Sequence, residues 1–132
     1  MAVEKARQHL KQWNMEDKII ELDVSSATVE LAAAALGVEG QRIAKTLSLQ
    51  MGEGCILVVT AGDTKIDNKK YKAKFNVKAK MLAYDDVERL IGHAAGGVCP
   101  FGVNQGVDIY LDESLKRFTT VFPAGGSSNS VL

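Results

Sequence analysis

The chain has little of what several classes of protein require. Its 132 residues include two cysteines and two histidines, and its sixteen basic and sixteen acidic residues cancel. Two cysteines are too few for a disulfide framework, and neither the cysteines nor the histidines have the spacing of a zinc site. We therefore expect no metal and no cofactor. The balanced charge excludes a generally basic coat, so any contact with nucleic acid must be local.

Long apolar runs are also absent. No run approaches the ~18 apolar residues that a membrane span requires. The N-terminal stretch MAVEKARQHLKQW has charged residues where a secretory signal needs an apolar core. These absences predict a cytoplasmic protein that makes no membrane contact. The 46% hydrophobic content and the length are typical of one globular domain with a sizeable core.

Hydrophobic periodicity and turn residues predict a mixed α/β (α+β) fold. Helices are expected over residues 2–14, 25–37, 67–75 and 84–91, and strands over 18–24, 42–50, 55–61, 106–112 and 117–124. Thr28 or Ser26 is the expected N-cap of the second helix, and Gly37 its stop. The turn MGEG should join two of the strands as a hairpin whose second strand is central. We expect a bent, barrel-like, mainly antiparallel sheet with helices packed outside and mostly hairpin connections.

One cation stands in an apolar row of the expected strand RIAKTLSLQ. Because strand side chains alternate between two faces, Lys45 shares a face with Ile43, Leu47 and Leu49. A charge there either snorkels to solvent at the end of the buried face or reaches a partner or pocket. The pattern alone leaves both interpretations open.

Residues 92–102, GHAAGGVCPFG, place four glycines and one proline in eleven positions. Such a loop can present backbone N–H groups in a concave arrangement, although it can equally be a plain connection. Cys99 lies six residues after His93, which raises a Cys–His nucleophile hypothesis. No orienting third group is apparent, and a buried thiol has an ordinary packing explanation.

The stretch KIDNKKYKAKFNVKAK, residues 65–80, holds seven lysines against one aspartate. A run of this kind is usually a solvated helix face. It is also the only local basic surface that could meet a polyphosphate backbone. The residues expected to contact such a backbone on this interpretation are Lys69, Lys70, Lys72 and Lys74.

Two motifs, IAKTL and GGVCPFG, occur in this order, separated by an apolar hairpin, a GD turn at Gly62 and Asp63, and the lysine-rich helix. This ordered set resembles the YbaK/prolyl-tRNA-synthetase-associated domain family. The resemblance covers nearly the whole chain. It implies a domain built round a barrel-like sheet, and a deacylase that hydrolyses mischarged aminoacyl-tRNA, free-standing or attached to a synthetase.

The resemblance also assigns residues and partners. The family lysine falls on Lys45 as the catalytic residue. The substrate-binding positions that it implies are Thr46, Gly96, Gly97, Val98, Cys99 and Pro100. Mischarged tRNA is the implied partner, with an aminoacyl-tRNA synthetase as a further one, and the oligomeric state is left open. The family's common substrates are alanine and cysteine attached to proline tRNA.

No Ser–His–Asp set is visible, so we expect substrate-assisted hydrolysis in which the ribose 2′-hydroxyl positions the water or relays a proton. The alternative is a module that binds aminoacyl-tRNA or aminoacyl-adenosine without hydrolysis. A protein-interaction domain would explain neither the lysine nor the glycine-rich loop.

Two features depart from the family pattern. Position 99 is cysteine where many relatives carry serine or threonine, so a nucleophilic role is not implied. Relatives usually continue beyond GGSSNSVL through another strand and a helix. We therefore expect residues 1–132 to form a single editing domain that lacks these elements, either as a shortened form or because they are dispensed with. A missing strand would leave an open sheet edge.

Overall fold

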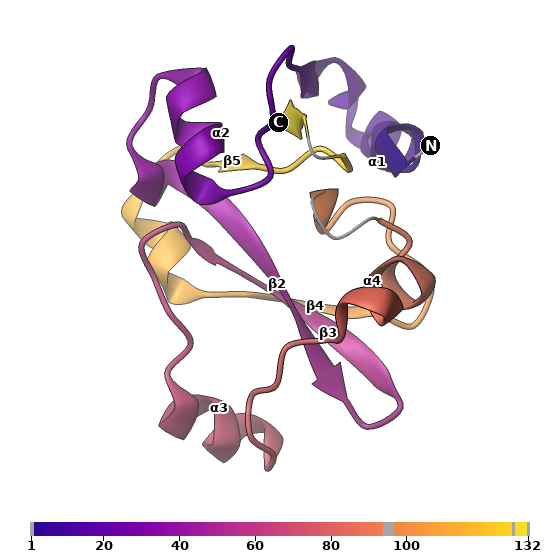
Figure 1. The fold of residues 1–132 in the computed structure, drawn as a ribbon, viewed down its shortest axis with the longest axis vertical. Helices are drawn as coiled ribbons and strands as arrows, with labels where there is room; N and C mark the ends of the chain where they lie inside the picture. The colour runs from indigo at the N-terminus through magenta and orange to yellow at the C-terminus, as the bar shows by residue number, and fades with distance from the viewer. Residues whose placement is uncertain (1, 94–96, 128, 132) are drawn as a thin grey trace.

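A computed structural model describes residues 2–93, 97–127 and 129–131 of the protein (Figure 1). The four α-helices in this part of the chain are α1 (Ala2–Leu10), α2 (Val29–Leu36), α3 (Asn68–Phe75) and α4 (Tyr84–Ile91). The strands are β1 (Ile20–Glu21), β2 (Ile43–Met51), β3 (Gly54–Ala61), β4 (Asp108–Leu111), β5 (Phe122–Pro123) and β6 (Ser130–Val131). The mixed α/β class is confirmed. Gly96 lies outside the described residues.

The main sheet has the strand order β4-β3-β2-β5. β2 and β3 form the predicted antiparallel hairpin, closed by Met51 and Gly54, with Gly52 at a φ of 60° in the turn. β3 is central, as expected. The outer strands differ from the expected hairpin connections, because β4 and β5 run parallel to their neighbours. The long stretch between β3 and β4, which contains α3 and α4, supplies the crossover that parallel pairing requires.

A second, two-stranded sheet joins the two ends of the chain. β1 pairs antiparallel with β6, with Ile20 opposite Val131. A bridge between Ala124 and Val131 connects this small sheet to the segment that follows β5. Figure 1 shows α1, α2 and β5 toward one end of the long axis and α3 at the other end. The main sheet spans the distance between them.

Local signals at the helix ends behave as the sequence predicts. The Thr28 side chain accepts a hydrogen bond from the backbone N–H of Leu31 and caps α2, and Gly37 ends that helix at a φ of 67°. The first helix is shorter than expected. It is α-helical only to Leu10 and continues as a 3-10 turn over Lys11–Trp13, so that Trp13 leaves the apolar face and is 56% exposed.

The helices cover both faces of the β2–β3 hairpin. On one face, Leu49, Ile56 and Val58 pack against Tyr71 of α3. On the other, Leu57 packs with residues 82–91, which include α4. Helices outside a bent sheet are therefore confirmed. None of the described helices is long and apolar enough to cross a membrane.

Candidate functional site

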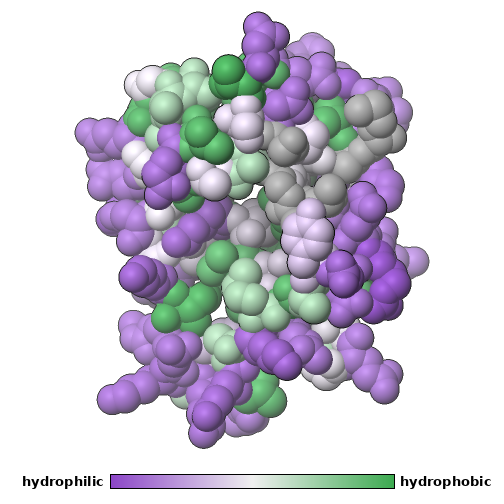
Figure 2. Space-filling view, viewed as in Figure 1, coloured by the Kyte–Doolittle hydropathy of each residue, from purple (hydrophilic) through white to green (hydrophobic). Residues whose placement is uncertain are grey.

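A pocket of about 130 Å³ lies at the beginning of β2, between the main sheet, α2 and the C-terminal segment. Figure 2 shows an opening near the middle of this face of the molecule, with hydrophobic residues above and below it. The residues that line the pocket are mostly small or apolar: Ser26, Ala27, Thr28, Val29, Ala32, Ile43, Ala44, Lys45, Thr46, Val98, Phe122, Ala124 and Val131. Three residues predicted from the sequence, Lys45, Thr46 and Val98, are brought together here.

The pocket coincides with a gap in the pairing of β2. β5 pairs with β2 only at Ile43 and Ala44. Further along the same edge, the backbone N–H of Leu82 donates to the carbonyl of Ser48, and that of Gln50 donates to Lys80. Within the described parts of the chain, residues 45–47 therefore have no strand partner on this edge.

The gap exposes backbone groups of one residue in particular. In a strand, alternate residues direct their N–H and C=O groups to the same edge. Because Ser48 and Gln50 bond on this edge, the N–H and C=O of Thr46 also point toward it. Thr46 also has a buried side-chain hydroxyl with no hydrogen-bond partner among the described residues. Within the described residues, the pocket wall thus carries a hydroxyl without a hydrogen-bond partner beside a stretch of strand edge without a paired strand.

Lys45 is half-buried and lies across the hairpin from Thr60, which is only 1% exposed. Among the residues that the structure describes, it forms no ion pair and no side-chain hydrogen bond. A cation without a counter-charge in a partly apolar pocket attracts an anion or a polarised carbonyl more strongly than it would in water. This position is suited to binding negative charge.

The neighbouring residues of the glycine-rich loop separate into two environments. Val98 lines the pocket. Gly97 is buried, and a Cβ atom at this position would lie 2.4 Å from the backbone of Ser127, so close packing explains this glycine. Neither Gly97 nor Pro100 is among the lining residues.

The side chain of Cys99 is 0% exposed and packs with Val3, Ala6, Leu10 and Ile19 in the core beneath α1. The structure therefore does not bring Cys99 to the pocket, because its thiol is buried in the apolar core.

Cys99 does lie beside His93, at 3.6 Å between Sγ and Nε2. The same Nε2 is 2.6 Å from the carbonyl oxygen of Phe101, so this nitrogen donates to the carbonyl and cannot accept the thiol proton. Burial raises the pKa of the Cys99 thiol to about 11 and lowers the pKa of His93. Both side chains are completely buried. The Cys–His nucleophile hypothesis finds no support in this geometry.

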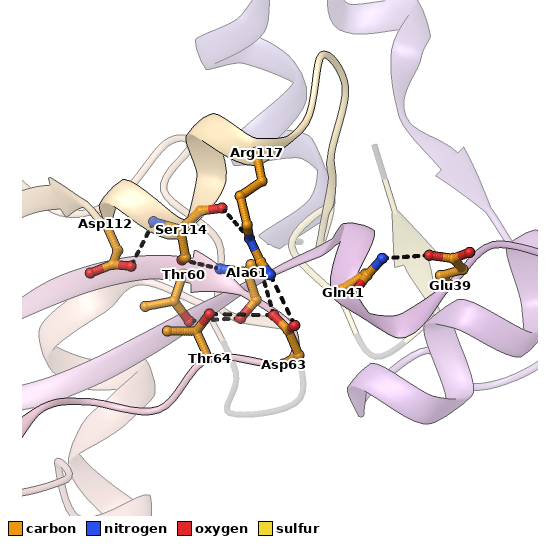
Figure 3. A network of polar contacts seen from close by, with 9 residues as sticks. All are labelled: Glu39, Gln41, Thr60, Ala61, Asp63, Thr64, Asp112, Ser114 and Arg117. Atoms are coloured by element: carbon orange, nitrogen blue, oxygen red, sulfur yellow. Dashed lines mark hydrogen bonds and ion pairs between the residues drawn. The ribbon is translucent and has the colours of Figure 1, made fainter.

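The end of β3, which supports Lys45 from the opposite strand, is fixed by a polar network (Figure 3). Arg117 of the 3-10 helix Glu113–Arg117 donates through both terminal nitrogens to the carboxylate of Asp63, at 2.5 and 3.1 Å. The hydroxyl of Ser114 accepts from the backbone N–H of Ala61. The hydrogen bond from Arg117 lowers the pKa of Asp63. The two residues of the GD turn, Gly62 and Asp63, therefore have structural roles. At Gly62, a Cβ atom would lie 2.1 Å from the carbonyl oxygen of Gly40, so only glycine fits there.

The lysine-rich stretch lies away from the pocket. The lysines predicted to contact tRNA are all exposed on α3: Lys69, Lys70, Lys72 and Lys74. Figure 1 places this helix at the end of the long axis opposite α2. Any role for these lysines therefore concerns a ligand large enough to reach both ends of the molecule.

Sequence reasoning missed most of the pocket wall. The sequence places residues 26–29 and Ala32 only in the second helix and its cap, and Phe122 and Ala124 only in a late strand, and it predicts no element at Val131. No local signal distinguishes these residues as lining ones. They meet because α2 and the C-terminal segment pack on either side of the gap in β2.

Solved structures share the fold of this chain. The chain superposes with a TM-score of 0.87 on the crystal structure of a candidate trans-editing enzyme for prolyl tRNA synthetase, at 29% identity, covering 98% of this chain and 83% of that one. This chain therefore has the fold of the trans-editing domain. The family model of the aminoacyl-tRNA editing domain matches residues 23–132, and the chain belongs to this family.

Two relatives from Bacillus subtilis (strain 168) differ in how much of their own length is similar to this chain. The uncharacterized protein YwhH is 53% identical over 134 residues, which cover 100% of this chain and 85% of YwhH. The proline–tRNA ligase is 28% identical over 90 residues, which are 67% of this chain and 16% of the ligase. Similarity to this chain is thus found along most of a short protein and in a small part of a longer ligase.

Proposed function

We propose that this protein hydrolyses the ester bond of mischarged aminoacyl-tRNA and so edits in trans. The observation that carries the proposal is the ammonium of Lys45, which has no counter-charge among the described residues and lies in a pocket that Val98 also lines, in a chain that belongs to the editing domain family. On this proposal the partners are mischarged tRNA and an aminoacyl-tRNA synthetase that releases it.

The geometry supports particular roles for the residues at the gap in β2. The ammonium of Lys45 would bind the ester carbonyl oxygen or the terminal phosphate. The backbone N–H of Thr46 would donate to the carbonyl oxygen as negative charge develops there. The backbone C=O of Thr46 would accept from the substrate's α-ammonium group. These groups are preorganised by the hairpin, so they need little rearrangement in the transition state.

The proton transfers would be carried by the substrate. Among the described residues that line the pocket there is no histidine, cysteine, aspartate or glutamate. We propose that the ribose 2′-hydroxyl positions a water molecule, whose oxygen attacks the ester carbon. The bond from that carbon to the ribose 3′-oxygen then breaks, and the proton lost by the water goes to this leaving oxygen. The products are a free amino acid and a deacylated tRNA.

The size of the pocket favours a small amino acid. A volume of about 130 Å³ between Ala32, Ile43 and Phe122 suits a short side chain better than a large aromatic one. Alanine and cysteine both fit such a pocket, and we propose them, attached to proline tRNA, as the substrates. The exposed lysines of α3 would hold the tRNA backbone at a distance from the reaction.

A binding module that retains aminoacyl-tRNA without hydrolysis is the second candidate. It is favoured by the same lack of an acid or base among the described lining residues. The two candidates differ in turnover. The test is a single-turnover assay with excess protein on proline tRNA that carries radiolabelled alanine, cysteine or proline, in parallel with retention of the same tRNAs on a filter.

Release of alanine or cysteine well above the uncatalysed rate, with proline retained on its tRNA, is the expected result. Retention on the filter without release would identify the binding module. Neither release nor retention for any of the three tRNAs would overturn both proposals.

A further inference from the structure

The strand β4 lies at the edge of the main sheet, and its outer side has no strand partner among the described residues. The backbone N–H of Asp112 donates to the carbonyl of Val59 in β3. Because backbone groups alternate between the two edges of a strand, those of Tyr110 also point to β3, whereas those of Ile109 and Leu111 point away from the sheet. Within the described parts of the chain, no hydrogen bond reaches these outward groups.

The same two residues also expose apolar side chains. Ile109 is 40% exposed and Leu111 is 72% exposed. They lie beside Leu57 and Val59 of β3, which are buried. Proteins usually protect an open edge with a charged residue, a proline or a covering segment. Residues 109–111 contain neither a charge nor a proline, so this edge is suited to pairing with another strand.

The other face of β4 carries one anion and one cation. Lys74 of α3 lies over the ring of Tyr110, at 5.5 Å from Nζ to the ring centroid. Asp108 is exposed and lies two residues before Tyr110, on the same face of the strand. Neither charge forms an ion pair within the described residues. A strand that pairs here must therefore bring an anion to Tyr110 and a cation to Asp108.

A second copy of β4 that runs antiparallel meets both requirements. The outward backbone groups belong to odd-numbered residues, so the new hydrogen bonds join odd-numbered residues only. When Ile109 lies opposite the partner's Ile109, Asp108 lies opposite the partner's Tyr110. The partner's Lys74 is above that ring, so each Asp108 meets a cation.

The charges also exclude the neighbouring registers. If Ile109 were opposite the partner's Leu111, Asp108 would lie opposite the partner's Asp112. If Ile109 were opposite the partner's Val107, Asp108 would lie opposite the partner's Asp108. Like charges directly opposite each other destabilise a strand pair. The sequence of this edge is therefore complementary to itself in one register.

We propose that this protein forms a symmetric dimer in which two β4 strands pair antiparallel about Ile109. The two four-stranded sheets then form one continuous sheet. On its apolar face, Leu111 lies opposite the partner's Val107. On the other face, the α3 helices of both copies lie on the same side of the sheet. The pairing does not depend on the proposed function.

Sedimentation equilibrium of the full chain, from micromolar to millimolar concentration, tests the dimer. We expect a dimer whose population rises with protein concentration. Leu111→Lys should raise the dissociation constant roughly tenfold or more, the scale of one apolar side chain that loses its burial. Val24→Lys changes another exposed apolar residue, which is 59% exposed, and should leave the dimer unchanged. Circular dichroism checks that both variants are folded.

Charge reversal tests the ion pairs between the copies. Asp108→Lys alone and Lys74→Asp alone each place like charges across the interface, so each should weaken the dimer roughly tenfold or more. The double variant restores opposite charges and should dimerise nearly as well as wild type. Losses that add in the double variant would overturn the proposed pairing.

Cross-linking tests the register. Residues that exchange both backbone hydrogen bonds have Cα atoms about 5.5 Å apart, which a disulfide can span. Under oxidised glutathione, Ile109→Cys should form a covalent dimer on a non-reducing gel. Leu111→Cys should not, because the partner's Val107 lies opposite it. The native cysteines Cys55 and Cys99 are buried and should not compete. Equal cross-linking of the two variants would overturn the register.

Two results of the sedimentation experiment would overturn the dimer itself. A monomer at every concentration would leave a strand of another protein as the occupant of this edge. A dimer that persists unchanged in folded Leu111→Lys would place the contact on another surface. Because neither measurement uses tRNA, failure of the dimer and failure of the proposed deacylation are distinguished.

Discussion

Val98 and Cys99 are consecutive residues that face opposite environments. The region that Val98 enters is open to solvent, whereas the region that Cys99 enters is buried. Val98 lines an open pocket in which Lys45 has no counter-charge among the described residues. Cys99 enters a sealed core beside His93. The sealed region holds the residue types that are typical of nucleophilic catalysis, yet His93 and Cys99 are both 0% exposed. In the part of the chain that the structure describes, the open region is lined by one lysine, one serine, two threonines and apolar residues, and the chemistry that we propose is placed there.

The largest effect is expected from removing the charge in the open region. Lys45→Ala should lower the single-turnover deacylation rate at saturating protein by about 10²-fold or more, the scale seen when one preorganised electrostatic interaction is removed. The measurement is release of radiolabelled alanine from mischarged proline tRNA. Lys116→Ala, which removes an exposed cation elsewhere, is the matched control. An unchanged rate in Lys45→Ala would mean that the lysine only snorkels to solvent.

The next effect concerns binding and should leave the chemical step intact. Replacing Lys69, Lys70, Lys72 and Lys74 with glutamine should weaken tRNA binding and flatten its salt dependence by roughly one unit of the logarithmic slope for each phosphate that is no longer neutralised. Filter binding across a salt series measures the slope, and Lys18→Gln with Lys116→Gln is the control. If the slope does not change, the lysines of α3 form an ordinary solvated face.

A smaller effect is expected in the sealed region, on stability. Burial lowers the pKa of His93 below its ordinary value of 6.5, so the unfolded chain binds a proton at this residue more readily than the folded one. The stability contributed by neutral His93 is therefore present above pH 6.5 and is lost as the pH falls below that value. Urea midpoints between pH 5 and 8 test this, and His93→Gln should show a flatter profile. An equally steep profile in this variant would assign the pH dependence to other groups.

The smallest effect on catalysis is expected from Cys99→Ser. The variant replaces a buried thiol, which lies 3.6 Å from the carbonyl oxygen of Phe101, with a hydroxyl, and we expect a cost of up to about 3 kcal/mol of unfolding free energy. Deacylation by the folded protein should be largely retained, because the thiol is not in the pocket. A loss of several orders of magnitude, with a trapped acyl-thioester, would instead establish covalent catalysis and reverse the comparison.

Local signals predicted the secondary structure well where one residue decides the conformation. Thr28 and Gly37 bound α2 as expected, and MGEG closes the hairpin. The predictions failed where distant packing decides. Trp13 fits a helical stripe in the sequence, but the chain leaves the α-helix at Leu10. The parallel pairing of β4 and β5 depends on connections that no window of adjacent residues contains.

The sequence by itself determined the family, the helix caps, the hairpin register and the unusual place of Lys45 in an apolar row, because each of these depends on the order of nearby residues. Only the tertiary structure decided which way each loop residue faces and where β2 lacks a partner. A strand edge is left open or covered by segments far away in the chain, here β5 and residues 80–82. The pocket exists because these two segments stop short of each other along β2, and that distance is set by packing in three dimensions.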